Sequence, residues 1–130
     1  MTPRPGPAPR TPTIVELEEQ ARGPGAEAAA WLRLGWALYA AGSYSKAADA
    51  ARESRTRSAS DPEPSYLLGM ALKAAGDGDG AVAAFKAAAA GLPAMQDAVR
   101  GAMLRRLAVG QVNWIERGMW DLEPETWIRT

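Results

Sequence analysis

The chain has 130 residues with 15 acidic and 15 basic side chains, so its formal net charge at pH 7 is zero. A chain of this length folds as one domain with a modest core, and without a basic excess we expect no nucleic-acid partner. It contains no Cys and no His, which excludes disulfides, thiolate nucleophiles and the commonest general base and metal ligand. We therefore expect no enzyme activity, no metal site and no cofactor.

The first twelve residues contain five prolines and no apolar periodicity, which predicts a flexible arm over 1–12. The arm has no apolar core of the kind that a secretory signal needs, and no later stretch reaches the roughly 18 apolar residues of a membrane span. We expect a cytoplasmic protein without membrane insertion. The abundance of Ala, Gly, Pro and Arg is typical of a GC-rich bacterial genome.

A short helix is expected next, within a segment over 13–25. The hydroxyl of Thr13 can cap its first turn while Glu16, three residues on, reaches back in a capping box. A Gly-Pro-Gly sequence then ends it. Its apolar side consists of Ile14, Val15 and Leu17.

From Ala26 onward the apolar pattern is helical, without strand-like alternation, and Ala-rich windows favour helices. Breaks rich in Gly, Ser and Pro divide this region. The predicted helices cover 26–41, 44–58, 63–76, 79–91, 94–109 and 111–118, followed by a Trp-containing tail over 119–130. The Asp-Gly repeat after Gly76 lacks the further ligands of a cation loop, and we interpret it as a turn between helices.

The breaks recur at a fixed distance. Gly42, Gly76 and Gly110 are each 34 residues apart, and so are Gly35 and Gly69. The same spacing relates Leu34 to Leu68, Leu38 to Leu72, Ala47 to Ala81 and Ala51 to Phe85. Two helices in a 34-residue period are typical of a repeat protein in which helical hairpins stack.

The residues in this period also resemble the tetratricopeptide-repeat (TPR) family, small bacterial type. One unit runs from Trp31 through Leu34-Gly35 to Ala51, and a second, better match runs from Tyr66 through Leu68-Gly69 to Pro93. The resemblance implies an all-α, right-handed solenoid of about two and a half to three hairpins over 26–118. In the third unit Met103 replaces the glycine at which the helices cross, so this unit is either a capping hairpin or shifted in register.

In the TPR family the first helix of each hairpin lines a concave groove that binds a peptide or a helix. Carried over by register, the groove positions are Leu32, Trp36, Tyr39, Glu63, Tyr66, Met70, Lys73, Asp97, Arg100 and Leu104. Their aromatic and apolar centre favours an apolar peptide or helix as ligand. The resemblance thus implies an adaptor or an assembly subunit of a larger complex. Alternatively, Trp36 and Tyr66 are core residues that the N-terminal helix covers.

Three of the five tryptophans, Trp114, Trp120 and Trp127, lie in the C-terminal part of the sequence. They either cap the last repeat or form a second, exposed contact patch. The patch allows a rival function, a homo-oligomeric scaffold that associates through this end. The nearby basic residues Arg100, Arg105 and Arg106 are interpreted as a solvated helix face, with binding of an anionic ligand as the alternative.

Overall fold

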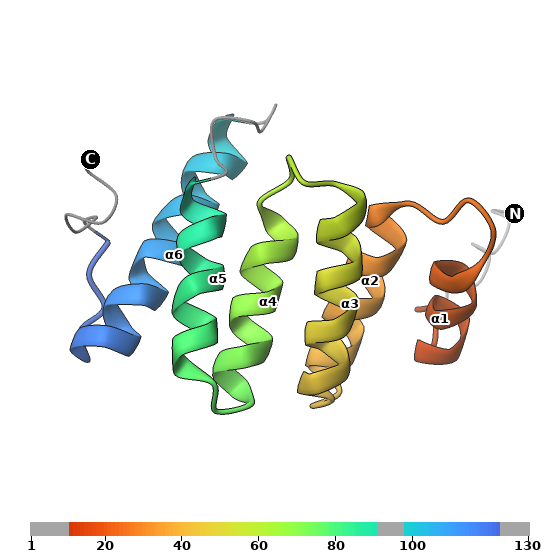
Figure 1. Ribbon diagram of the computed structural model, residues 1–130, viewed down its shortest axis with the longest axis horizontal. Helices are drawn as coiled ribbons and strands as arrows, with labels where there is room; N and C mark the ends of the chain where they lie inside the picture. Colours follow the sequence, from red (N-terminus) through yellow and green to blue (C-terminus); the bar gives the residue numbers. More distant parts are fainter. Residues whose placement is uncertain (1–10, 91–97, 123–130) are drawn as a thin grey trace, which may run out of the picture.

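The computed structural model describes residues 11–90 and 98–122, and these ranges contain six α-helices and no strand (Figure 1). The all-helical class predicted from the sequence is therefore confirmed for them. Most of the predicted arm, part of the tail and the groove position Asp97 lie outside the described residues. The helices are α1 (Ile14–Arg22), α2 (Ala28–Ala40), α3 (Tyr44–Arg57), α4 (Glu63–Ala74), α5 (Gly78–Ala90) and α6 (Ala98–Arg117).

Helix α1 begins where the sequence predicts. Thr13 is its N-cap, and the Thr13 Oγ1 accepts a hydrogen bond from the Glu16 amide at 3.2 Å. The same hydroxyl donates a hydrogen bond to the Glu16 carboxylate, also at 3.2 Å. Leu17 and Ala21 are buried on α1, whereas Val15, expected on the apolar side, is exposed.

The turns that end α2 and α4 are closed in the same way. Gly42 and Gly76 have φ of 81° and 91°, a left-handed conformation that L side chains rarely adopt. After α2 the Ser43 amide donates to the Leu38 carbonyl at 2.9 Å, and after α4 the Asp77 amide donates to the Leu72 carbonyl at 2.8 Å. Both bonds satisfy carbonyls that the end of a helix leaves open. The two glycines therefore act as the predicted helix terminators.

Two other repeated glycines lie where helices approach closely. A Cβ on Gly69 would lie 2.7 Å from the Phe85 ring of α5, and one on Gly35 would lie 2.5 Å from the Leu67 side chain of α4. Gly35 also faces Ala47 and Ala50 of α3. Small residues at these positions let the helix backbones come together, as the repeat pattern predicts.

The core consists of two clusters of buried side chains along the row of helices. The first gathers residues of α1, α2, α3 and α4 together with Ala84 of α5, and the second gathers residues of α4, α5 and α6. Trp36 and Leu72 pack against both clusters, so the two are continuous. Each helix packs against the next along the chain, and α4 also contacts α2 and α6.

The predicted break at Gly110 is wrong. Helix α6 runs without interruption from Ala98 to Arg117 and ends at Gly118, whose φ is 69°. Gly110 is buried inside the helix, where a Cβ would lie 2.5 Å from the Trp120 ring. The buried pair Val109-Gly110 thus resembles Leu34-Gly35 and Leu68-Gly69, but it follows the second pair by 41 residues. The sequence leaves two interpretations of the third unit, a capping hairpin or a shifted helix register. The uninterrupted helix α6 agrees with the shifted register.

Candidate protein-binding face

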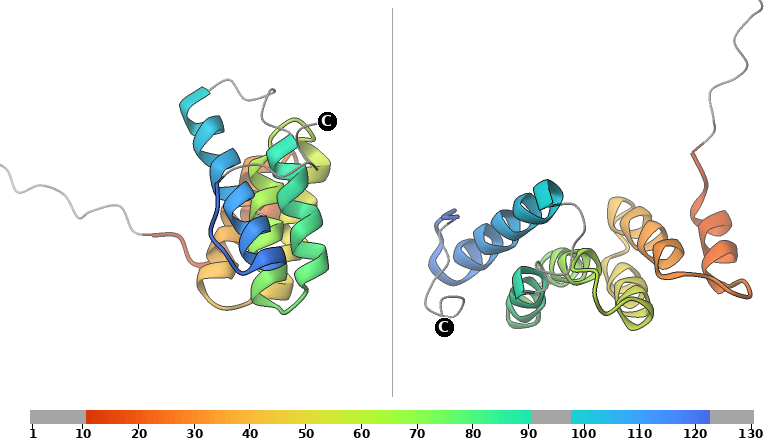
Figure 2. Two further views of the ribbon diagram at one scale, coloured as in Figure 1. Left: turned by 90° about the vertical axis from the view of Figure 1, so that its left-hand side faces the viewer. Right: turned by 90° about the horizontal axis from the view of Figure 1, so that it is seen from above.

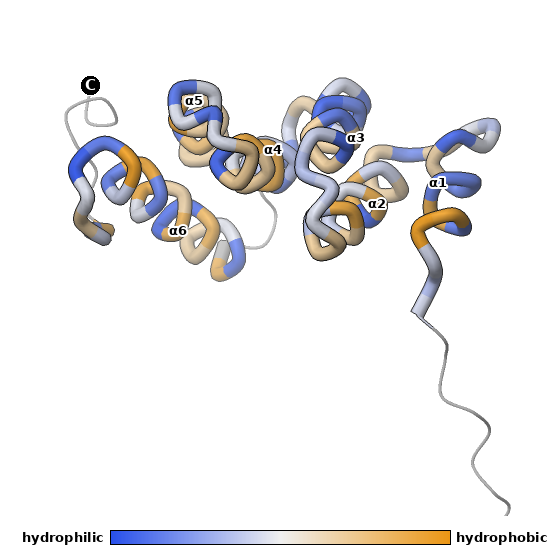
Figure 3. The backbone as a smooth tube through the Cα atoms, turned by 90° about the horizontal axis from the view of Figure 1, so that it is seen from below, coloured by the Kyte–Doolittle hydropathy of each residue, from blue (hydrophilic) through white to orange (hydrophobic). Residues whose placement is uncertain are grey.

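The first helices of the predicted hairpins lie toward one side of the molecule. Seen end-on, α2 and α6 are on the same side of the row, with α4 set back between them and α3 and α5 behind (Figures 2 and 3). We call this side the α2–α4–α6 face. It is defined by Trp36 and Tyr39 of α2, by Glu63, Tyr66, Met70 and Lys73 of α4, and by Arg100, Leu104 and Gln111 of α6.

Glu63 connects the three helices of the face. One of its carboxylate oxygens accepts a hydrogen bond from the Trp36 indole Nε1 at 3.3 Å, and the other pairs with the Arg100 guanidinium. The Glu63 side chain is 19 % exposed, whereas that of Arg100 is 52 % exposed. A carboxylate that is largely removed from water needs such partners, because an uncompensated buried charge is strongly unfavourable.

A second carboxylate lies just before α4. Asp61 accepts a hydrogen bond from the Glu63 amide at 3.0 Å, which satisfies a donor in the first turn of the helix. Burial raises the pKa of Asp61 above its ordinary value, and the charge of Arg100 opposes this rise. The arginine thus faces two carboxylates at the start of α4.

Gln111 connects α4 and α6 further along the face. Its side-chain oxygen accepts a hydrogen bond from Lys73 Nζ at 2.8 Å, and its Nε2 lies 3.4 Å from the Met70 sulfur. Burial raises the pKa of the Tyr66 phenol; a hydrogen bond with Gln111 opposes the rise, and Tyr39 adds to it. Tyr66, Gln111 and Lys73 are therefore parts of one polar cluster on this face, separate from the pair of Glu63 and Arg100.

The aromatic rings form a continuous series across α2 and α4. The ring centroids of Trp36 lie 6.0 Å from Tyr39 and 6.4 Å from Tyr66, and Tyr66 lies 5.4 Å from Phe85 of α5. Tyr66 is buried at the inner end of this series. Trp36 and Tyr39 are half-buried, so parts of their rings stay accessible to a ligand.

The predicted groove residues fall into three groups by exposure. Tyr66 is buried and Arg100 is exposed. The half-buried residues are Leu32, Trp36, Tyr39, Glu63, Met70, Lys73 and Leu104. Among the described helices α1 contacts only α2, so Tyr66 is buried by a cluster of α5 and α6 residues and by Trp36, and not by the N-terminal helix.

Two features of the face are not evident from the repeat register. The central position of Glu63 between Trp36 and Arg100 depends on how three helices meet. The helix break expected at Gly110 would separate Gln111 from the helix that carries Arg100 and Leu104, so the repeat register does not place Gln111 on the face. The signal that could have revealed it is the apolar period continuing through Ala108, Val112 and Ile115, which favours one uninterrupted helix.

The C-terminal tryptophans are only partly packed. Trp114 and Trp120 are 49 % and 48 % exposed. Trp120 nevertheless lies against Gly110, and the side-chain amide of Asn113 donates to the Asp121 carbonyl at 2.6 Å, which holds the segment after α6 against the helix. Trp127 lies outside the described residues.

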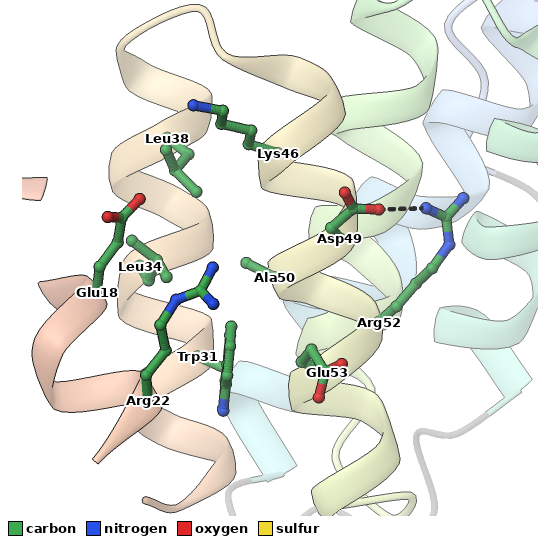
Figure 4. A pocket seen from close by; sticks show the side chains of 10 residues that line it. All are labelled: Glu18, Arg22, Trp31, Leu34, Leu38, Lys46, Asp49, Ala50, Arg52 and Glu53. Atoms are coloured by element: carbon green, nitrogen blue, oxygen red, sulfur yellow. Dashed lines mark hydrogen bonds and ion pairs between the residues drawn. The ribbon is translucent and has the colours of Figure 1, made fainter.

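A separate pocket of about 500 Å³ lies between α1 and α3 (Figure 4). The side chains of Trp31, Leu34 and Leu38 on α2 form its floor. Its walls carry three acidic and three basic side chains, which are Glu18, Arg22, Lys46, Asp49, Arg52 and Glu53. Because these charges are balanced, the pocket has no clear preference for an anion or a cation.

Chemical sites of other kinds are not evident in residues 11–90 and 98–122. These ranges hold no cluster of three acidic side chains placed to bind a metal ion, and none of their helices is long and apolar enough to cross a membrane. Comparisons with protein-family models, with curated proteins and with solved structures give no match.

Proposed function

We propose that this protein is a TPR-type interaction module that serves as an adaptor or assembly subunit and binds an apolar peptide or helix on the α2–α4–α6 face. The observation that carries the proposal is the chemistry of this face. Accessible parts of Trp36, Tyr39, Met70 and Leu104 lie on three helices, and their polar neighbours already bind one another. Aromatic and Met side chains of this kind are common binding hot spots.

The repeated glycines support the TPR part of the proposal. Gly35 and Gly69 allow close helix approach, and Gly42 and Gly76 close the turns, as the family resemblance implies. The shifted Val109-Gly110 pair of α6 is then an atypical terminal unit, which is common in repeat proteins because one side of the last unit has no neighbour.

We favour the adaptor over the self-associating scaffold, its rival. A symmetric contact through the C-terminal end would place the same surface of two copies face to face. That surface includes Arg105 and Arg106, so like charges would approach each other. Sedimentation of the purified chain tests this choice: a monomer supports the adaptor, and a stable dimer without a partner supports the scaffold.

The binding role is tested by capture of partner proteins from the native organism. The face variant carries Tyr39→Ala, Met70→Ala and Leu104→Ala, and the matched control carries Arg52→Ala and Arg55→Ala on α3. We expect the wild type and the control to capture the same partner in equal amounts. The face variant should capture at least tenfold less of it, because each hot-spot truncation costs about 1 kcal/mol or more of binding free energy. Circular dichroism checks that all three chains are folded. Full retention by the folded face variant would refute the proposed site.

A further inference from the structure

Helix α6 has an apolar surface that no other helix of the described residues covers. Helices α2 and α4 are each followed by a helix that packs against them, α3 and α5 respectively. Among the described residues, only the short segment 118–122 follows α6. Val99, Met103 and Leu107 lie four residues apart along α6, so they share one side of the helix. Their exposed fractions are 76 %, 60 % and 37 %.

This side of α6 borders a cavity of about 610 Å³. The cavity is lined by Val99, Ala102, Met103, Arg106, Leu107, Trp120 and Leu122. Six of these side chains are apolar, and the one charged group is a cation. An occupant that fits this lining combines apolar side chains with acidic ones.

The described part of the chain ends at this cavity. After Gly118 the backbone turns back along α6, as the Trp120 contact with Gly110 and the hydrogen bond between Asn113 and Asp121 require. Leu122, the last described residue, is part of the cavity lining. The described chain therefore ends beside the apolar surface, and eight further residues follow in the sequence.

We propose that residues 123–130 dock on this surface of α6 and fill the cavity with Trp127 and Ile128. Their sequence is EPETWIRT, which carries two acidic residues before the apolar pair. Glu123 and Glu125 are opposite in charge to Arg106, the one cation of the lining. This inference concerns a surface apart from the α2–α4–α6 face and does not depend on the proposed function.

The distances allow this docking. Trp127 is five residues beyond Leu122, and an extended chain spans about 3.4 Å per residue, so the side chain can reach about 17 Å away. The apolar stripe from Val99 to Leu107 spans eight steps of helix, or about 12 Å at 1.5 Å per step. Trp127 can thus reach any part of the stripe.

The tether also favours the chain's own segment over other occupants. A segment joined to the rim of its site has an effective concentration on the order of millimolar, so even a weak contact is populated. A second copy would instead bring its own Arg105 and Arg106 to the same surface.

The absence of native Cys allows a single-site test on the full chain. A nitroxide label is attached at Val99→Cys, which is exposed at the end of the stripe, and the indole N–H signals of the tryptophans are followed by NMR. We expect the Trp127 signal to lose most of its intensity and to recover when the nitroxide is reduced. The matched control is a label at Arg52→Cys on α3, which makes no helix contact with α6 and should leave the Trp127 signal unchanged.

A mixed sample distinguishes the occupants. It combines ¹⁵N chains without label and spin-labelled chains without ¹⁵N, so only contacts between copies cause signal loss. An unchanged Trp127 signal in the singly labelled chain would overturn the proposal, and so would an equal loss in the mixed sample. Binding of an apolar fluorescent dye is a second measurement. Trp127→Ala should increase dye binding several-fold, whereas Trp114→Ala should leave it unchanged. Equal dye binding by the two variants would also contradict the docking.

Discussion

Replacing Gly69 by Ala tests whether the helix crossing requires a residue without a side chain. A Cβ at this position would lie 2.7 Å from Cδ1 and Cε1 of Phe85 and 2.9 Å from its Cγ. The Phe85 ring cannot move easily, because it is 0 % exposed and packs against Tyr66. Forcing one extra methyl group into such a core costs about 1–3 kcal/mol.

A second effect partly offsets this cost. Ala is more favourable than Gly inside a helix by about 1 kcal/mol. We therefore expect Gly69→Ala to lower the free energy of unfolding by about 1 kcal/mol, which corresponds to a drop in Tm of roughly 4–8 °C for a domain near 100 residues. Urea unfolding followed by circular dichroism measures the change in the free energy of unfolding. An unaltered slope of this free energy against urea concentration shows that the folded state is as compact as before.

Two further variants isolate the cause. Gly78→Ala is the matched control, since its Cβ would lie 3.7 Å from Ile115, an ordinary contact distance, and its stability should be equal or higher. Phe85→Leu should reduce the cost of Gly69→Ala, because contacting residues show coupling in a double-mutant cycle. A Gly69→Ala protein as stable as the wild type, with no coupling to position 85, would refute the packing argument.

Two other variants test the start of α4 and the end of α6. Asp61→Asn keeps an acceptor for the Glu63 amide but removes a charge that burial disfavours. Because the pKa of Asp61 is raised in the folded chain, the wild type loses stability as pH rises above 3.8. The variant should therefore be more stable than the wild type at pH 7 and lose this advantage below pH 3.8. Equal urea midpoints of the two proteins at pH 7 would contradict this. Gly110→Ala would place a Cβ 2.5 Å from the half-exposed Trp120 ring, which can move aside. We expect a red shift of tryptophan emission without loss of stability, and a loss as large as that of Gly69→Ala would show that Trp120 is fixed.

Much of the fold could be predicted because its repeat depends on local backbone chemistry. The ends of α2 and α4 follow from Gly42 and Gly76, which adopt a conformation that favours glycine wherever it occurs. Gly110 has the same spacing but another role. A glycine that ends a helix and one that admits a neighbouring ring look the same in a sequence, and only the Trp120 contact distinguishes them.

The candidate face was harder to predict in detail than the helices. The 34-residue register correctly places Trp36 and Met70 on helices that share one side of the molecule. It could not identify Gln111 as the neighbour of Met70, because α6 is displaced relative to the repeat. Nor could it assign Glu63 its two partners, since Trp36 and Arg100 are 27 and 37 residues away from it along the chain.

The packing of each helix against its near neighbours has a consequence for folding. No helix contact in the described ranges joins elements more than two apart in the chain, so the sequence separation of contacts is low and topology favours rapid folding. Such an array behaves as a one-dimensional lattice whose ends open first. Amide exchange should therefore be slowest in α4, which contacts α2, α3, α5 and α6, and fastest in α1, which contacts only α2.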